Sequence, residues 1–444
     1  MAVAPPGNLA AANPAANPAV SPAAPAEDSL AYLERLRSVI GTRGEPRRAK
    51  DPVSEPIIRI WCDAVGDDNP AYQDPAWAQQ SRFGGITAPA TTLNMWTLPG
   101  NRRAHRYGEP LDIVTEILAE RGFTSVAAVN NNHEYIRPLR PGDHLSQIQH
   151  IGAVSEEKQT ALGQGHFIDL VSEYVTEAGE LVGRVLLRML RWNPSTRQGA
   201  PTDDSSVVDR LQPISRPRAQ AIPTRSGIGT VRSFLQPVYA VEPTEERPFV
   251  VADVELADGT TVVSDLLNVE PQAVRVGMRV DVLARETRTG ELLPVFQPAR
   301  PARRVDTITF ADVEPGMVLA PWPVPLTQLS IAALATATFD FNDVHLDRDA
   351  ALRRGARDVY MNILGSTGLV NCFLTDWAGP EAVLKAIQVR LQKQNFPGDT
   401  LTLVGTVSDK RLQDGAGLVD VAVRGYNSLG DHLVARCTLD LPVT

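Results

Sequence analysis

Cysteine is nearly absent from this sequence, and its few cysteines are not spaced to bind a metal. The chain has 444 residues but only three cysteines, Cys62, Cys372 and Cys437, which lie far apart and form no C-x-x-C pair. This spacing excludes a cysteine-based zinc site and a framework of disulfides. It fits a reducing compartment, so we expect a cytoplasmic protein without a bound metal.

An excess of positive charge and long apolar runs are also missing. The chain carries 43 Lys and Arg against 52 Asp and Glu, a net charge of -9. This balance argues against a nucleic-acid partner, because such binding depends on neutralising phosphates. No apolar run approaches the ~18 residues that span a membrane, so we expect no membrane partner. The apolar fraction of 43% is ample for buried cores, and the length suggests about three domains.

Two segments lack the periodicity of helices or strands. Residues 1–27 are mostly Ala, Pro and Asn, without the basic start and continuous apolar core of a signal peptide. We expect a disordered tail, because this composition buries too little surface to offset the entropy of the chain. Residues 196–224 are rich in Pro, Ser, Asp and Arg and are interpreted as a linker.

The regions 28–195 and 301–444 repeat one order of patterns. Each is expected to place a helix before a short polar loop, then a buried helix, then four strands. The preceding helices are expected at 28–40, 54–65 and 327–338, and the buried helices start within 81–97 and cover 363–378. The strands are expected at 125–137, 144–154, 164–176 and 180–192, and again at 383–395, 400–410, 416–426 and 432–441. We therefore predict a duplicated α+β unit in which antiparallel strands wrap one buried helix.

Residues 225–300 differ from both repeats because they are strand-like throughout. Short strands with glycine turns, such as Asp258-Gly259, predict a small all-β barrel of the OB type. Such barrels often bind nucleic acid. The acidic chain and the scarcity of regularly spaced aromatic residues instead favour a protein-docking or spacer role here.

The loop D-F-N-D-V-H in the second repeat carries the most informative chemistry. Asp340, Asn342 and His345 lie there between two expected helices, in a composition that favours turns. A carboxylate and an imidazole five residues apart can hold one water, and either can serve as the base. An isolated pair of this kind is more often a helix cap beside a structural histidine, whereas the flanking helices and the P-G-D turn at 397–399 favour catalysis. Asn342 is expected to hold the loop through side-chain to backbone hydrogen bonds.

The first repeat contains a related loop, D-D-N-P-A-Y, that lacks the imidazole. Asp67 and Asn69 occupy the matching positions, but Tyr72 stands where the histidine is expected. A phenol with an ordinary pKa near ~10 is a poor base at neutral pH, so the first repeat is expected to be non-catalytic. Asp143 and Asp399 follow Pro-Gly in both repeats and are expected to support turns that lead into strands.

The string A-T-x-D-F-N-x-x-H-L-D, followed by a buried helix and F-P-G-D, resembles the MaoC-like hydratases, which have a hot-dog fold and add water to trans-2-enoyl-CoA thioesters. Residues 28–195 resemble the degenerate MaoC-like domain that pairs with a catalytic one. Residues 225–300, with V-x-V-G-M-x-V and P-V-F-Q-P, resemble the OB part of the DUF35 family. The whole order resembles a fusion of the two subunits of actinobacterial steroid side-chain enoyl-CoA hydratases.

This resemblance implies an α+β fold class, with two hot-dog folds separated by a small all-β OB-fold barrel. It implies that Asp340 and His345 are catalytic, with Asn342 in support. It also implies a backbone N–H for the thioester oxygen, for which Ile363 at the start of the buried helix is the candidate. Arg390 and Lys393 are the candidates to bind the phosphates of CoA.

The resemblance further implies that no cofactor is needed besides the CoA of the substrate, and that a thiolase-like aldolase docks on residues 225–299. A homodimer remains open. The sequence departs from the family at Asp343, which replaces a proline, and at Asn362-Ile363, which replaces an H-G pair. The four-cysteine zinc ribbon of DUF35 proteins is missing, so zinc is not expected. Two other interpretations stay open: a hot-dog acyl-CoA thioesterase, and a non-catalytic scaffold that binds acyl-CoA.

Overall fold

A computed structural model of the chain describes residues 26–101, 109–160, 162–196, 228–235, 250–286, 292–354 and 356–443. The expected tail and the expected linker lie almost wholly outside the described residues. Within the described part of the chain, no helix combines the length and apolarity needed to cross a membrane.

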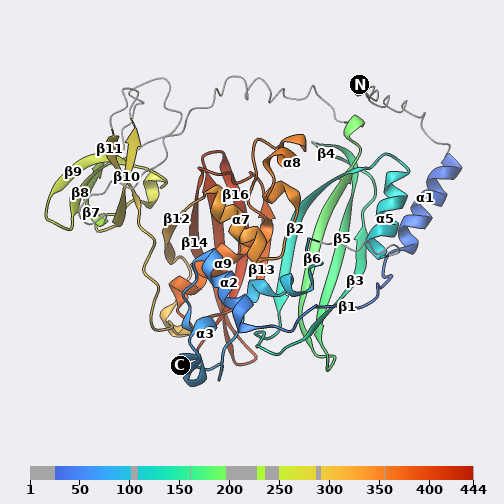
Figure 1. Ribbon diagram of the computed structural model, residues 1–444, viewed down its shortest axis with the longest axis horizontal. Helices are drawn as coiled ribbons and strands as arrows, with labels where there is room; N and C mark the ends of the chain where they lie inside the picture. Colours follow the sequence, from blue (N-terminus) through green and yellow to red (C-terminus); the bar gives the residue numbers. More distant parts are fainter. Residues whose placement is uncertain are drawn as a thin grey trace, which may run out of the picture.

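One antiparallel sheet of eleven strands forms the body of the molecule (Figure 1). The order along it is β1-β3-β5-β6-β2-β13-β16-β15-β14-β12, and β4 pairs with β5 outside this path. The strands of the first half are β1 (Arg47–Arg48), β2 (Ser125–Tyr135), β3 (Leu145–Val154), β4 (Lys158–Thr160), β5 (Gly163–Thr176) and β6 (Leu181–Trp192). Those of the second half are β12 (Val318–Pro325), β13 (Val383–Leu391), β14 (Thr400–Gln413), β15 (Ala416–Asn427) and β16 (Gly430–Leu441). The predicted strands are confirmed, and the order of one half mirrors that of the other.

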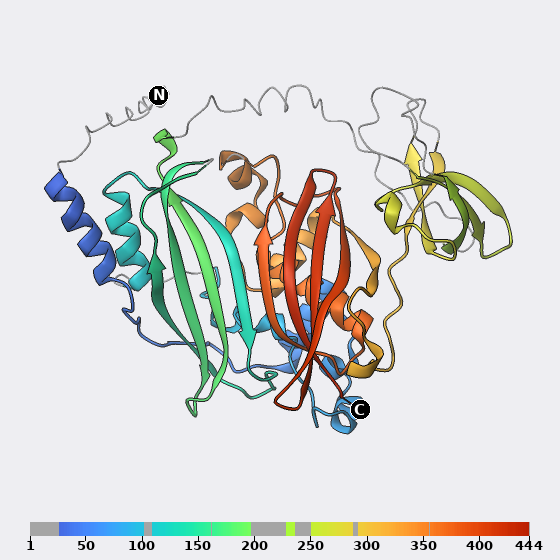
Figure 2. The same ribbon diagram turned by 180° about the vertical axis from the view of Figure 1, so that it is seen from behind.

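The two halves meet where β2 pairs with β13. Ala386–Arg390 lies opposite Asn130–Glu134 in antiparallel register. Ile387 and Val389 point into the core from this strand, while Gln388 and Arg390 point to the other face, because side chains alternate along a strand. Figure 2 shows that face of the sheet, which the helices leave uncovered.

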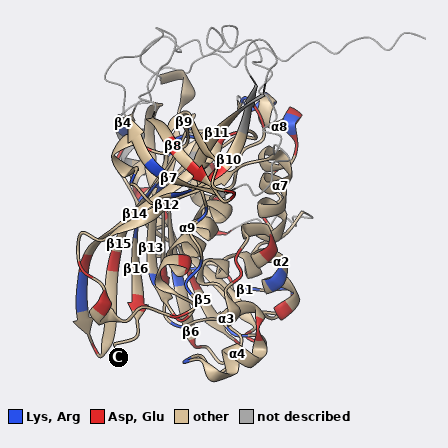
Figure 3. Cartoon of the chain, turned by 90° about the vertical axis from the view of Figure 1, so that its left-hand side faces the viewer, with Lys and Arg blue, Asp and Glu red and all other residues tan. Residues whose placement is uncertain are grey.

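The helices gather on the opposite face of the sheet (Figure 3). They are α1 (Ala26–Ser38), α2 (Glu55–Val65), α3 (Pro70–Gln73), α4 (Pro75–Gln80), α5 (Pro110–Ala119), α7 (Gln328–Ala337), α8 (Arg348–Arg353) and α9 (Ile363–Ala378). Helix α9 is buried along almost its whole length. Its Gly368 lies against the ring of Trp61, where an added Cβ would come within 3.0 Å. One apolar core contains Trp61 and Tyr174 of the first half together with Leu369 and Phe373 of α9, so both halves pack on the same helix.

The expectation of a buried helix starting within 81–97 is wrong. The structure has only two short 3-10 turns there, η1 (Ala90–Thr92) and η2 (Met95–Thr97). Pro89 and Pro99 bracket this stretch, and Thr91 and Thr92 are β-branched, so a long helix is disfavoured. Turn η1 instead packs against α9, which makes α9 the shared central helix of both hot-dog folds.

The predicted small barrel is confirmed between the two halves of the chain. Strands β7 (Ile228–Leu235), β8 (Val250–Leu256), β9 (Thr261–Leu266), β10 (Arg279–Glu286) and β11 (Leu292–Pro298) close into a five-stranded barrel. Its core, which includes Val231, Val280 and Phe296, is separate from the two apolar clusters of the hot-dog halves. The barrel contacts the second half through polar groups: the Asn268 carbonyl accepts a hydrogen bond from Thr402 at 3.0 Å, and Glu270 pairs with Arg424.

Candidate active site

The end of helix α7 places Asp340. The helix stops because Phe339 adopts a left-handed conformation with φ of 56°. The Asp340 N–H then donates to the Ala335 carbonyl at 2.9 Å, which is the hydrogen bond of a Schellman cap. A non-glycine residue in this region is strained, and such strain is concentrated at functional sites. Asp340 thereby leaves the helix at a fixed angle.

A 3-10 turn, η6 (Asp343–His345), places the histidine. The His345 N–H donates to the Asn342 carbonyl at 3.1 Å. The ring is oriented by Tyr360, whose carbonyl accepts a hydrogen bond from Nδ1 at 2.7 Å and whose own ring meets the imidazole edge-on at a centroid distance of 5.1 Å. With the proton on Nδ1, Nε2 is free to act as an acceptor.

The two predicted catalytic side chains face each other. His345 Nε2 lies 3.6 Å from Asp340 Oδ2, with side-chain exposures of 9% and 20%. This separation is too long for a direct hydrogen bond. Both atoms are acceptors, so a single water can donate one hydrogen to each and turn its own lone pairs outward.

The start of α9 completes this region. Asn362 caps the helix, and its Oδ1 accepts the Gly365 N–H at 3.0 Å. Its amide nitrogen donates to Asp340 Oδ2 at 3.2 Å and to Thr338 Oγ1 at 2.9 Å. Ile363 is the first residue of the helix, where backbone N–H groups point outward. Sequence reasoning missed the contact between Asn362 and Asp340, because nothing in a sequence joins a cap to a carboxylate 22 residues earlier.

The remaining predicted residues of the loop and turns are also located. The Asn342 backbone N–H approaches Asp340 Oδ1 at 3.4 Å, and the Asn342 side chain makes no capping hydrogen bond to the turn. Asp143 and Asp399 support turns as expected, because their carboxylates accept the backbone N–H of Arg140 at 2.8 Å and of Phe396 at 2.9 Å.

The two predicted phosphate-binding residues lie apart from this pair. Arg390 lies on the uncovered face of the sheet, where it lines a shallow trough of about 650 Å³ together with Arg424 and Arg436. Lys393 is exposed just beyond the end of β13. The role of both residues in binding CoA remains a prediction.

The corresponding loop of the first half is closed. Asp67 has no exposed side-chain surface, and its Oδ1 lies 2.5 Å from Arg303 Nη2. Burial raises the pKa of Asp67, and the neighbouring guanidinium opposes that rise. Tyr72, at the position of the imidazole, is buried as well, and burial raises the pKa of its phenol. No catalytic pair forms from these two residues.

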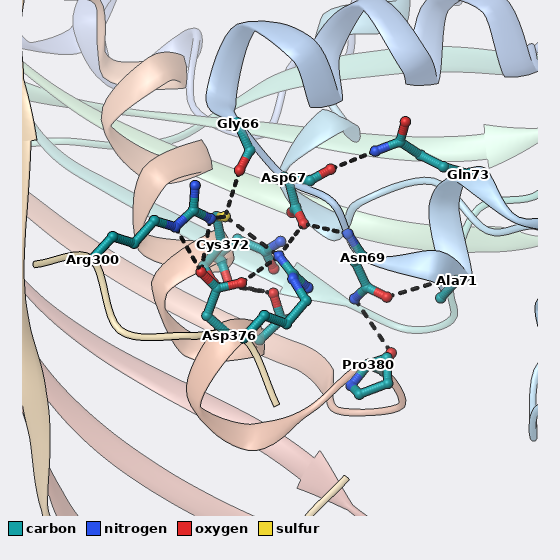
Figure 4. Close-up of polar contacts among 12 residues, drawn as sticks. Gly66, Asp67, Asn69, Ala71, Gln73, Arg300, Cys372, Asp376 and Pro380 are labelled. Carbon is teal, nitrogen blue, oxygen red and sulfur yellow. Dashed lines mark hydrogen bonds and ion pairs between the residues drawn. The ribbon is translucent and has the colours of Figure 1, made fainter. Parts of the chain in front are cut away.

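Asp67 belongs to a buried ionic cluster whose members lie far apart in the sequence (Figure 4). Arg303 also pairs with Asp376 near the end of α9, and Arg300 pairs with Asp376 at 2.8 Å while stacking on Trp322 at 4.4 Å. Asp67, Cys372 and Asp376 place potential ligand atoms within 4.8 Å of one another. Two guanidinium groups already match the charge of the two carboxylates, so the cluster is an ion-pair network and does not resemble a metal site.

Three family patterns match the chain, one on each part. Residues 38–185 match the FAS1-like dehydratase domain region, residues 224–285 the C-terminal OB-fold domain of ChsH2, and residues 310–426 the MaoC-like domain. Among solved structures, a MaoC-like dehydratase covers 92% of this chain and is itself fully covered, with a TM-score of 0.56 at 18% identity. That likeness supports the fold.

Curated relatives extend the comparison. The chain is 33% identical to a "Probable enoyl-CoA hydratase alpha subunit" of Thermomonospora curvata, across 61% of this chain and 97% of that protein. It is 31% and 46% identical to the alpha and beta subunits of the 3-oxo-4,17-pregnadiene-20-carboxyl-CoA hydratase of Mycobacterium tuberculosis. Those matches cover 53% and 25% of this chain, and 88% and 83% of the two subunits. The chain therefore belongs to the MaoC-like enoyl-CoA hydratases and carries an OB-fold domain between two hot-dog domains in one polypeptide.

Proposed function

We propose that this protein hydrates a trans-2-enoyl-CoA thioester with a bulky, steroid side-chain-like acyl group, giving the 3-hydroxyacyl-CoA. Asp340 and His345 are the catalytic residues. The observation that carries the proposal is the 3.6 Å separation of their two acceptor atoms, combined with the His345 Nδ1 proton being held by the Tyr360 carbonyl. This arrangement suits one water held by two acceptors over the substrate.

The reaction then needs only this water, which supplies both the hydroxyl group and the proton that are added. The water oxygen bonds to the β-carbon as one of its protons passes to Asp340 or His345. The electron pair of the double bond moves toward the thioester oxygen, where the N–H of Ile363 at the positive end of α9 is the candidate donor. The enolate then takes a proton at the α-carbon from the protonated residue. The sum is addition of one water, with no oxidant or cofactor.

The relatives and the missing helix both bear on the size of the acyl group. Two relatives are named for a pregnadiene-carboxyl-CoA substrate. The first half also lacks a continuous helix in 81–97, so it presents short turns to α9 where a second helix is expected. Both features favour a wide substrate over a short-chain one. A turnover screen of short-chain against steroid side-chain enoyl-CoAs tests this choice.

The catalytic assignment is tested with Asp340→Asn and His345→Ala. Each should lower the rate of enoyl-thioester absorbance loss by about 100-fold or more, with the circular dichroism spectrum unchanged. Tyr72→Phe is the matched control in the closed half and should keep the wild-type rate. Near wild-type turnover in both catalytic variants would refute the site.

Two other functions are separated by the same samples. A thioesterase releases free CoA, which a thiol reagent detects, whereas hydration releases none. A scaffold binds enoyl-CoA without any turnover. A water held by Asp340 and His345 could serve either reaction, and the names of the relatives, which are enoyl-CoA and pregnadiene-carboxyl-CoA hydratases, favour hydration.

We also propose that the barrel docks a thiolase-like aldolase that cleaves the hydrated product. The barrel has its own core, and it exposes apolar side chains on the two strands that flank β8. Leu235 of β7 and Val263 of β9 are 71% and 68% exposed, with β8 pairing between them. Exposed apolar groups gathered on one small domain are typical of a protein-binding surface.

The docking proposal is tested by co-purification with a thiolase-like protein. Leu235→Asp combined with Val263→Asp should weaken the complex as strongly as deletion of residues 225–299. Leu412→Asp, at a side chain 62% exposed on the second hot-dog half, is the matched control and should leave the complex intact. Complex formation that survives the deletion rejects this role of the barrel.

A further inference from the structure

The side chain of Asn362 joins three parts of the site. It is buried, and both ends of its amide are used. Oδ1 accepts the Gly365 N–H at 3.0 Å, which caps α9. Nδ2 donates to Thr338 Oγ1 at the end of α7 and to Asp340 Oδ2. The amide orientation is determined by this network, because the reverse orientation would set its oxygen against the carboxylate and its NH₂ against the Gly365 N–H.

The hydrogen bond to Asp340 falls on the oxygen that faces the histidine. Asp340 Oδ2 accepts a hydrogen bond from Asn362 Nδ2 at 3.2 Å and lies 3.6 Å from His345 Nε2. The other oxygen, Oδ1, receives the Asn342 backbone N–H at 3.4 Å. The Asp340 side chain is 20% exposed, and the donors at both of its oxygens hold the carboxylate in one plane. We propose that Asn362 is a positioning residue, which aligns the Asp340 carboxylate with His345 while it caps the central helix.

A capping role alone does not explain an amide at this position. A helix N-cap needs only an acceptor, and aspartate serves as well as asparagine. Elsewhere in the chain, Asp74 and Asp347 cap α4 and α8 in this way. Beside Asp340, an aspartate cap would set two carboxylates against each other. The amide supplies the same acceptor to the helix and a donor to Asp340, so its second function accounts for the choice of residue.

The inference rests on the proposed hydration and is tested with Asn362→Asp. This variant keeps the cap but replaces the donor by a second carboxylate. We expect kcat to fall at least tenfold at neutral pH, with KM changed less than twofold. The acid limb of the kcat–pH profile should move upward by about one unit, since two adjacent carboxylates hold a proton more tightly than one.

A neutral variant and a cap control complete the test. Asn362→Ser keeps a short capping oxygen without a donor to Asp340, so kcat should fall while melting temperature changes little. Asp347→Ala removes the cap of α8 and should lower the melting temperature without moving the pH profile. If Asn362→Asp folds and retains the wild-type kcat and acid limb, the positioning role is overturned. The hydration proposal fails separately, through activity in Asp340→Asn and His345→Ala.

Discussion

At the scale of single residues, the two halves differ by more than the exchange of an imidazole for a phenol. In the second half, Asp340 is partly exposed and its Oδ2 faces His345. In the first half, Asp67 has no exposed surface and is already paired with Arg303. The exchange of histidine for tyrosine is therefore only one of two differences, because the carboxylate of the first half is also unavailable.

This difference predicts that a histidine cannot restore the first site. In a His345→Ala background, Tyr72→His should give no gain in hydration, because the carboxylate partner stays buried against a guanidinium. The measurement is the rate of enoyl-thioester absorbance loss, compared with that of His345→Ala alone. A rate that rises tenfold or more would show that Tyr72 was the only defect.

At the scale of elements, the segment between the barrel and the second hot-dog half binds to the degenerate site. Arg300 and Arg303 lie between the regions that match the OB-fold and MaoC-like patterns. They pair with Asp67 of the first half and with Asp376 of α9. The closed loop of the first half thus anchors the connection between domains.

Removing Arg303 should destabilise the fold strongly. Arg303→Met leaves Asp67 and Asp376 buried with less counter-charge, and losing one partner of a buried pair costs about 3–5 kcal/mol of unfolding free energy. Burial raises the pKa of Asp67 above its ordinary value, and removing the guanidinium takes away the charge that opposes this rise. The folded state then binds more protons than the unfolded state, so the deficit should shrink as the pH falls toward the raised pKa of Asp67.

Urea unfolding of the wild type and Arg303→Met between pH 5 and pH 8 measures this effect, because the slope of the unfolding free energy against pH reports the difference in bound protons between the unfolded and the folded state. Arg184→Met is the matched control, because the Arg184 side chain that pairs with Glu134 and Glu173 is itself 45% exposed, and it should change stability little. An equal, pH-independent loss in both variants would contradict a charge-based role for Arg303.

The elements themselves were largely predictable from the sequence. Helix α9 is bounded at the predicted residues because an apolar run ends at Gly379-Pro380, and the strands follow alternating patterns between turns. The prediction of a helix for 81–97 is wrong because the apolar content of this stretch indicates that it is buried, which is correct, but does not determine its backbone conformation. The pairing of Arg303 with Asp67 spans 236 residues, and no local pattern encodes a contact at that separation.

At the scale of the whole molecule, the apolar cores do not coincide with the two repeats of the sequence. One apolar core includes residues of both hot-dog halves, and the β2–β13 pairing continues one sheet through them. The barrel has a separate core. Because cooperativity follows shared cores, the two hot-dog halves should unfold together, and the barrel should unfold as a unit of its own.

Hydrogen exchange in increasing urea, resolved by peptide, distinguishes these units. Ile387→Ala at the β2–β13 seam removes a buried side chain and should cost about 2–5 kcal/mol. It should accelerate exchange in β5 and β6 of the first half as much as in β15 and β16 of the second. Phe296→Ala in the barrel core is the matched variant and should accelerate exchange only in the barrel strands. If Ile387→Ala affected the second half alone, the halves would be independent domains despite their continuous sheet. The closed first half would then be a separate partner domain instead of a part of the catalytic fold.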